Sequence, residues 1–240
     1  MARKARENNA GRPARAHPRR AAKPAGRRSR TTDDSPYHHG ALHDALLKAA
    51  ERVLERDGLA GLTLRAVARE AGVSHAAPTH HFGDLTGLLS ELAAIGFRMF
   101  NAAMVVARNS ETHLLMKGMA TAKAYVAFAQ AHPGIYSLMF RNERLDMTRP
   151  SLHEAATTSF AGLARGVGAS RQEKIPGETL EALSLDQAAA IARAWSLVHG
   201  FTMLLLDGRL KDILHRLPEG TAPDQLLEAM LRSTGRPPGV

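Results

Sequence analysis

The sequence contains no cysteine. This absence excludes disulfide bonds, thiolate zinc sites and cysteine nucleophiles together, and it fits the reducing cytoplasm in which we expect the protein to act. Aromatic residues make up only 5% of the chain, and runs of β-branched residues are missing while alanine and leucine are abundant. This composition favours an all-α fold over a sheet.

Long hydrophobic runs are also lacking. The longest strongly apolar stretch, near Leu197–Leu206, is too short to span a bilayer and is broken by His199 and Gly200. The N-terminus has no apolar segment of the kind found in a secretory signal. We therefore predict no membrane partner.

The common catalytic motifs are missing as well. The sequence has no G-x-S-x-G, no H-E-x-x-H and no P-loop, and the glycine-containing stretch Gly166–Ser170 lacks the third glycine of a dinucleotide fingerprint. Three histidines lie close together, but the spacing of His75 and His80 is not that of helical metal ligands, and adjacent His80 and His81 point in different directions. We therefore expect no catalytic residues, no metal, no cofactor and no enzymatic activity.

Positive charge is concentrated at the N-terminus. Residues 1–36 contain eleven basic and three acidic residues, so they carry +8 of the net charge of +9. This segment has several prolines and glycines and few apolar side chains larger than alanine, so we expect a disordered basic arm. The arm either contacts DNA phosphates without sequence preference or only increases solubility. A mitochondrial transit peptide fits less well because serine is scarce.

The stretch from Thr63 to Phe82, TLRAVAREAGVSHAAPTHHF, carries the strongest local signal. Thr63 is a good N-cap for a short helix, and Gly72 permits a sharp helix exit. Ser74 is predicted to cap a second short helix that runs to Phe82. Two short helices joined by a glycine-containing turn are typical of a helix-turn-helix, whose second helix enters the DNA major groove.

The flanking sequence resembles the DNA-binding domain of the tetracycline-repressor (TetR) family of bacterial transcription regulators. Before the helix-turn-helix come YHHGAL at Tyr37–Leu42 and an amphipathic helix at 41–57, in which His39 and His43 are expected to contact phosphate or lie on plain surface; FGDLTGLL follows. Further along, HPGIYSLMF at His132–Phe140 and AWSLVHGF at Ala194–Phe201 resemble the ligand-binding domain of a subgroup with a Trp-His-Gly motif.

The resemblance implies an all-α protein of about nine helices. It consists of a three-helix DNA-binding domain at 37–84 and a helical ligand-binding and dimerisation domain at 85–240. Apolar spacing predicts the later helices at 84–108, 112–131, 133–140, 151–167, 185–207 and 223–233, with a loop at 168–181. In the first of these we expect an inner stripe of Leu88, Leu92, Ile95, Met99, Ala102 and Val106.

The implied function is a repressor in the bacterial nucleoid that binds a pseudo-palindromic operator as a homodimer and is released by a ligand. The last two helices would pair with those of a second subunit. The alternative is a constitutive architectural DNA-binding dimer without small-molecule control. The expected DNA contacts are Thr63, Arg65, Ser74, His75, Ala76, Ala77, Thr79 and His80.

Two positions depart from the family pattern. Thr79 stands where most members have a tyrosine that contacts the DNA backbone, and Leu85 stands where they usually have a lysine. Both changes remove phosphate contacts, so the operator of relatives cannot be carried over.

An apolar or aromatic effector is expected in the C-terminal domain, because bulky and adaptable side chains recur on its helices while acidic ones are missing from the inner stripes. Each of these side chains taken singly could equally be plain core. The expected pocket residues are Phe97, Met104, Met119, Tyr125, Phe128, Tyr136, Met139, Trp195 and His199.

The charged arm gives a direct prediction. Deleting residues 1–36 should weaken binding to all DNA alike and flatten the slope of log K against log salt, because fewer counterions are released. Titrating the full and truncated chains onto one duplex at several salt concentrations measures this slope. An unchanged slope would mean that the arm does not touch DNA.

Overall fold

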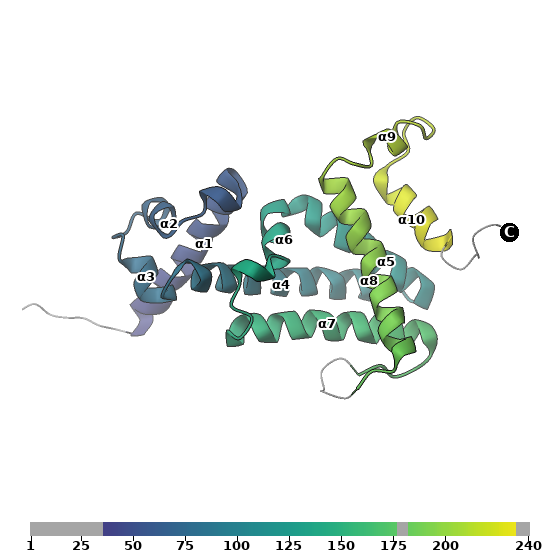
Figure 1. Ribbon diagram of the computed structural model, residues 1–240, viewed down its shortest axis with the longest axis horizontal. Helices are drawn as coiled ribbons and strands as arrows, with labels where there is room; N and C mark the ends of the chain where they lie inside the picture. The colour runs from purple at the N-terminus through teal and green to yellow at the C-terminus, as the bar shows by residue number, and fades with distance from the viewer. Residues whose placement is uncertain (1–35, 177–181, 234–240) are drawn as a thin grey trace, which may run out of the picture. The chain divides into compact units, whose positions relative to one another are not determined.

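The computed structural model describes residues 36–176 and 182–233, with side chains from residue 40 onward, and its regular elements are all helices (Figure 1). The predicted all-α fold is confirmed, but the predicted count of about nine omitted the four-residue helix α9. The predicted basic arm lies outside the described residues, except for Pro36. The helices are α1 Pro36–Gly61, α2 Leu64–Ala71, α3 Ala77–Phe82, α4 Leu85–Asn109, α5 Leu114–Ala131, α6 Pro133–Met139, the 3-10 turn η1 Asn142–Arg144, α7 Pro150–Arg171, α8 Leu185–Leu206, α9 Lys211–Leu214 and α10 Pro223–Ser233.

Helix α1 changes direction at Gly58. This residue has φ 67° and ψ −178°, so the regular helix is interrupted there and a last short turn continues to Gly61. A side chain at this positive φ would be strained, which explains why glycine occupies the position. The predicted end of the helix at Gly58 therefore marks the kink.

Helix α4 runs beside α7, and most of its buried residues lie in its first four turns (Figure 1). Asp84 caps it by accepting a 2.8 Å hydrogen bond from the Gly87 amide. The predicted inner stripe fails in the second half of the helix, where Ala102 is exposed and Val106 is 71% exposed. The reason is that α6 packs against α4 near Gly96 and leaves the later turns uncovered on that side.

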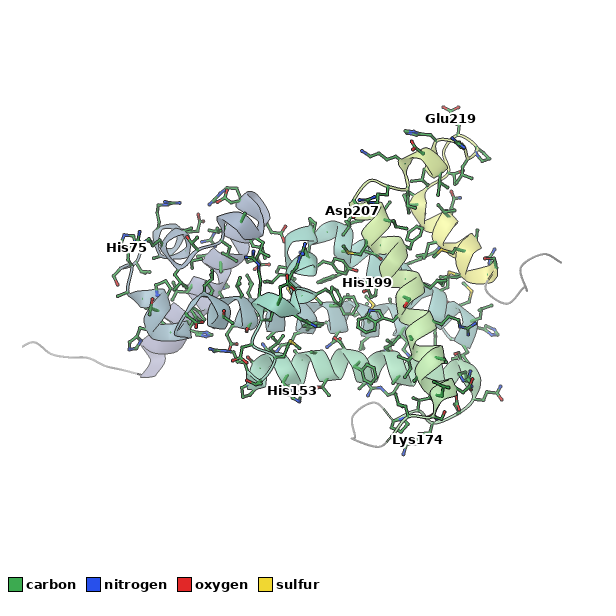
Figure 2. All side chains as sticks on the ribbon, in the orientation of Figure 1. His75, His153, Lys174, His199, Asp207 and Glu219 are labelled. Atoms are coloured by element: carbon green, nitrogen blue, oxygen red, sulfur yellow. The ribbon has the colours of Figure 1, made fainter. Side chains whose placement is uncertain are left out.

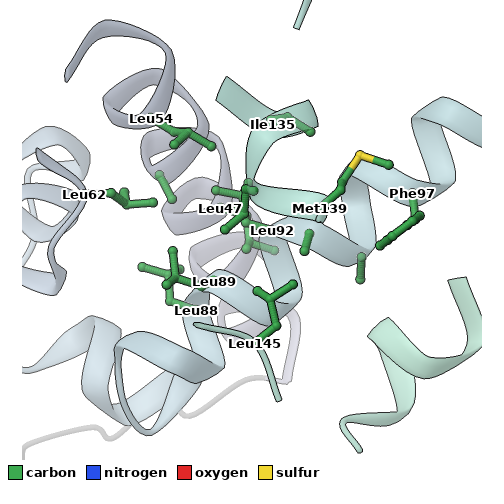
Figure 3. Packing of buried hydrophobic residues seen from close by; sticks show 14 of the residues in the cluster. Leu47, Leu54, Leu62, Leu88, Leu89, Leu92, Phe97, Ile135, Met139 and Leu145 are labelled. Carbon is green, nitrogen blue, oxygen red and sulfur yellow. The ribbon is translucent and has the colours of Figure 1, made fainter. Parts of the chain in front are cut away.

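One hydrophobic core joins the helix-turn-helix to the C-terminal helices. Leu88 and Leu92 of α4 lie between leucines of the α1–α2 region and Ile135, Met139 and Leu145 beyond them (Figure 3). The core therefore runs without a break across the expected domain boundary at residues 84 and 85. Smaller clusters join α5, α8 and α10, and join α7 to α8.

Helix α7 is longer than expected. The predicted loop begins at residue 168, but the helix continues to Arg171 and ends at Gln172, which has φ 58°. Gly168 is buried, and a Cβ there would lie 2.6 Å from the Glu173 carbonyl oxygen. This glycine thus lets the chain fold back on the last turn of the helix, so it does not end the helix as its loop-like context suggested.

Two helices, α4 and α8, are long and apolar enough to cross a bilayer by length and composition alone. A buried core helix passes the same test, and α4 is such a helix. Helix α8 differs, because only 22% of its most apolar stretch is buried. Leu185 is 88% exposed, and Trp195 and Leu204 are each 43% exposed.

Gly96 sets the distance between α4 and α6. A Cβ at this position would lie 2.5 Å from Cγ2 of Ile135 and 3.0 Å from Met139. Ile135 is fully buried and β-branched, so its side chain has little freedom to move away.

We predict that Gly96→Ala lowers the free energy of unfolding by about 1–3 kcal/mol through overpacking. Gly118→Ala is the matched control, because Gly118 is an exposed helical glycine whose Cβ would meet nothing within 4 Å. The control should be neutral or more stable by up to about 1 kcal/mol. Urea denaturation of both variants measures the two free energies of unfolding. Equal unfolding midpoints for Gly96→Ala and Gly118→Ala would show that α6 does not pack closely on α4.

Candidate DNA interface and aromatic cluster

Helix α2 and its turn have the expected caps. Thr63 is extended, and its hydroxyl oxygen accepts a 3.1 Å hydrogen bond from the Ala66 amide. Gly72 has φ 68°, and its amide is bonded to the last carbonyls of the helix. Arg65 projects from the first turn and is exposed.

Helix α3 begins later than predicted. Its N-cap is Ala76, which provides no side-chain hydrogen bond, and Ser74 lies in the preceding turn. Pro78 explains the difference. A helix capped at Ser74 would need an amide hydrogen at position 78 to reach the Ser74 carbonyl, and proline has none. Instead the Ala77 amide bonds to the Ser74 carbonyl at 3.0 Å, and α3 starts with Pro78 in its first turn.

The predicted DNA contacts lie on the α2–α3 stretch. Pro78 and Phe82 are buried, so they turn the remaining side chains of α3 away from the core. His75 lies at the outer end of the α2–α3 turn (Figure 2). Ala77 is half-buried, and the other seven predicted residues are exposed: Thr63, Arg65, Ser74, His75, Ala76, Thr79 and His80.

An ion-pair network ties α2 to α1. Nε of Arg52 lies 2.8 Å from Glu70, and Arg56 donates hydrogen bonds to both Glu70 and Asp57. Hydrogen bonds from Arg52 and Arg56 lower the pKa of the Glu70 carboxyl, and Arg56 likewise lowers the pKa of Asp57. These exposed pairs join α1 to α2 but contribute little stability. Helical spacing alone does not reveal this pairing, because it depends on the turn that brings α1 and α2 together.

His43 of α1 packs against the end of α3. Its ring centroid lies 5.0 Å from that of Phe82 and 6.0 Å from that of His81. His43 therefore lies in the contact between α1 and the C-terminal end of α3. Among the residues with described side chains, no three His, Cys, Asp or Glu gather as metal ligands.

A second cluster joins α5, α6 and α8. The hydroxyl oxygens of Tyr125 and Tyr136 each lie 2.9 Å from Nδ1 of His199, and 3.3 Å from each other. We call these three residues the polar triad. His199 lies on α8 (Figure 2). Tyr136 is fully buried, whereas Tyr125 and His199 are half-buried.

Burial sets the charge state of the polar triad. It raises the pKa of the Tyr125 and Tyr136 hydroxyls and lowers the pKa of the His199 imidazole. At neutral pH the triad is therefore uncharged, with two phenol donors and a ring nitrogen.

The structure brings most of the predicted pocket residues together. Phe128 joins the triad through Phe100, whose ring lies 5.4 Å from that of Phe128 and 4.9 Å from that of Tyr125. Phe97 joins it through Phe140. Trp195 lies at the exposed edge of this aromatic cluster, beside His199. The three methionines are not part of the triad. Met139 is buried beside Gly96, Met104 packs against the main core, and Met119 is buried in α5.

Sequence reasoning missed Phe100 and Phe140. Phe100 follows Phe97 by three residues, and Phe140 follows Tyr136 by four, so helical spacing alone could have identified both. Two open hollows in the described surface lie away from this cluster. One is an open groove of about 260 Å³ beside Lys123 and Asp224, and the other, of about 390 Å³, borders the stretch from Leu214 to Thr221.

Comparison with known families agrees with this architecture. Residues 46–92 match the bacterial regulatory proteins of the tetR family, and residues 119–234 match the tetracyclin repressor-like C-terminal domain. The chain belongs to the TetR family of transcriptional regulators. It is therefore a DNA-binding regulator and not an enzyme, and the helix-turn-helix is its DNA-binding element.

Several solved structures share the fold. A protein of unknown function from Rhodococcus sp. RHA1 is 35% identical over 83% of this chain and 96% of its own, with a TM-score of 0.65. A putative tetR family transcription regulator from Shewanella sp. PV-4 is 17% identical over 79% and 95%, with a TM-score of 0.54. FadR from Bacillus subtilis, solved in complex with stearoyl-CoA, is 14% identical over 80% and 96%, with a TM-score of 0.57. No curated protein matches the chain significantly.

The exposed surface of this TetR helix-turn-helix predicts the effect of two substitutions. Arg65→Ala and His80→Ala should each cost about 1–3 kcal/mol of operator binding if the contact is to a base edge. Arg98→Ala is the control, because it removes an exposed arginine from α4, outside the helix-turn-helix. Fluorescence anisotropy with a duplex selected from random DNA measures the three affinities. Unchanged affinity in both test variants would argue strongly against this docking.

Proposed function

We propose that the protein is a repressor that binds a pseudo-palindromic operator as a homodimer and is released by a small, largely apolar effector. We also place it in the TetR subgroup with a Trp-His-Gly motif, on the strength of AWSLVHGF in α8. The observation that carries the proposal is the polar triad, because it sets three hydrogen-bonding groups among aromatic rings.

The charge state of the triad indicates the class of effector. Two neutral phenols and a neutral imidazole can bind an uncharged polar group but do not offset a full charge. Nδ1 of a neutral imidazole makes at most one hydrogen bond, as donor or acceptor according to the tautomer, although two hydroxyls lie 2.9 Å from it. One phenol can therefore turn to an effector without losing a bond to His199. We propose a neutral or weakly polar aromatic or lipid-like compound.

The effector would enter from the α8 side. Trp195 is 43% exposed there and His199 is half-buried, whereas Tyr136 below them is closed off. The rings of the cluster lie 4.7 to 6.4 Å apart, so binding has to separate α8 from α5 and α6. The stearoyl-CoA complex of FadR shows that a protein with this fold can hold a small molecule.

Helix α6 connects the triad to the DNA-binding helices. It carries Tyr136, and its Ile135 amide donates a 3.4 Å hydrogen bond to Glu55 of α1. Gly134 of α6 approaches Leu54 and Glu55 closely. An effector that displaces α6 would therefore move α1, and a 100-fold loss of operator affinity needs only about 2.7 kcal/mol of preference for the released state.

Helix α8 supplies the argument for a homodimer. Its outward residues Leu185, Ala189, Ala192, Ser196 and Leu204 are exposed and recur at helical spacing. A Cβ at Gly200, on the same stripe, would meet nothing within 4 Å. Small side chains let another helix approach closely, so we propose that α8 and α10 pair with those of a second copy. A helix that is apolar on both faces is normally covered on both.

A constitutive DNA-binding dimer is the second candidate function. The close packing of the aromatic cluster favours it, because its rings lie only 4.7 to 6.4 Å apart. The two functions differ in one observable property, which is whether any compound changes DNA affinity.

We predict that a neutral aromatic or medium-chain lipid-like compound releases the protein from a selected duplex and raises its melting temperature. Tyr136→Phe keeps the ring and removes the hydroxyl, so it should weaken this response by about 10-fold while DNA affinity without compound stays the same. Anisotropy and thermal melting across a compound library measure both effects.

The control compound is a hydrocarbon analogue without the polar group. It should act equally on the wild-type protein and on Tyr136→Phe, because it cannot bond to the triad. If no compound in a broad library changes either signal, the constitutive binder is the better account.

A further inference from the structure

The connection between α6 and α7 is held against the first turns of α4. Leu145 is buried in the main core, and the Asp146 amide donates a 2.9 Å hydrogen bond to the hydroxyl oxygen of Ser90. Ser90 is fully buried, and its own hydroxyl donates to the Thr86 carbonyl at 2.7 Å. These contacts fix residues 145 and 146 beside the N-terminal end of α4.

Arg149 extends this contact to the DNA-binding helix. One guanidinium nitrogen lies 3.2 Å from the Glu91 carboxylate on α4, and another donates a 3.2 Å hydrogen bond to the Phe82 carbonyl oxygen. The Ser151 hydroxyl donates to the same Glu91 oxygen at 2.9 Å. The side chains of Arg149 and Glu91 are 29% and 17% exposed, so this pair is better shielded from water than the surface pairs of α1 and α2.

Gly87 provides the space for this arrangement. A Cβ on this residue would lie 2.0 Å from the Phe82 carbonyl oxygen and 2.6 Å from the guanidinium of Arg149. The end of α3 and the arginine can therefore both reach the first turn of α4 only because position 87 has no side chain. The Gly87 amide is used at the same point to cap α4 on Asp84.

We propose that Arg149 is a positioning residue for DNA recognition, which fixes the C-terminal end of α3 from the C-terminal part of the chain. Phe82 is the last residue of a six-residue helix, and the last carbonyls of a helix lack partners within it. A helix this short depends on its ends for order. The planar guanidinium donates to the carbonyl and the carboxylate together, and its positive charge is favourable at a helix C-terminus.

The consequence is for specificity more than for general affinity. Contacts to base edges require α3 in one fixed orientation, whereas phosphate attraction tolerates motion. Loss of Arg149 should therefore reduce discrimination between a selected duplex and a random one. The proposal rests on DNA binding through α2 and α3 and needs no effector.

The test compares Arg149→Met with Arg144→Met in the full chain. Arg144 is an exposed arginine of η1, so its substitution removes the same charge from the same connection. The probes are a duplex recovered by the wild-type protein from random DNA and a duplex of random sequence. Arg149→Met should lower the ratio of the two affinities by about 10-fold relative to Arg144→Met, while the salt slope stays equal in both.

Hydrogen exchange provides a readout that does not depend on DNA. The amides of residues 77 and 79–83 should exchange faster in Arg149→Met and not in Arg144→Met. If selection from random DNA recovers no preferred sequence, sequence-specific recognition through α2 and α3 is wrong, whatever Arg149 does. The hydrogen-exchange rates of α3 then test the role of Arg149 without DNA. Equal ratios and equal exchange in the two variants would overturn the proposal.

A third variant, Arg149→Lys, tests the proposal if Arg149→Met does not fold. Lysine keeps the charge beside Glu91 but has a single ammonium, so it should hold one acceptor and reduce the affinity ratio by about threefold. If Arg149→Met does not melt cooperatively, Arg149→Lys decides the question. A wild-type ratio and wild-type exchange in that variant would then overturn the proposal.

Discussion

Close packing against the N-terminal half of α4 is the constraint on which the other features of this protein depend. Two glycines make it possible. Gly87 admits the end of α3 and the guanidinium of Arg149, and Gly96 admits Ile135 and Met139 of α6. A side chain at either position would collide with its neighbours. The DNA-binding helices and the C-terminal helices therefore share one core and have no flexible linker between them.

This shared core gives a physical basis for communication between the two parts. A packed interior does not deform smoothly, so a displacement of α6 has to be accommodated by α4, by α1 or by both. Tyr136 of the polar triad and Ile135, whose amide bonds to Glu55 of α1, are adjacent residues of α6. Arg149 provides a separate route, because it joins α4 to the last carbonyl of α3 without passing through α6.

Local features of the fold were predictable from the sequence, and partners distant in the chain were not. Thr63, Gly72 and Asp84 act through hydrogen bonds within four residues, so their residue types indicate the helix ends directly. The start of α3 was predictable in principle, since Pro78 is incompatible with a cap at Ser74. By contrast, the pairs Arg52–Glu70 and Arg149–Phe82 join residues 18 and 67 positions apart. Helical spacing shows which face a residue occupies but not which helix covers that face.

The central claim is that the protein reads DNA through two symmetry-related copies of the α2–α3 surface. Selection of bound sequences from random DNA, followed by footprinting of the recovered duplex, tests it most directly. Two recognition helices related by a two-fold axis should select a pseudo-palindrome with half-sites about 34–36 Å, or a multiple of that distance, apart. A single protected half-site bound by a monomer, or no recovered motif, would contradict the account.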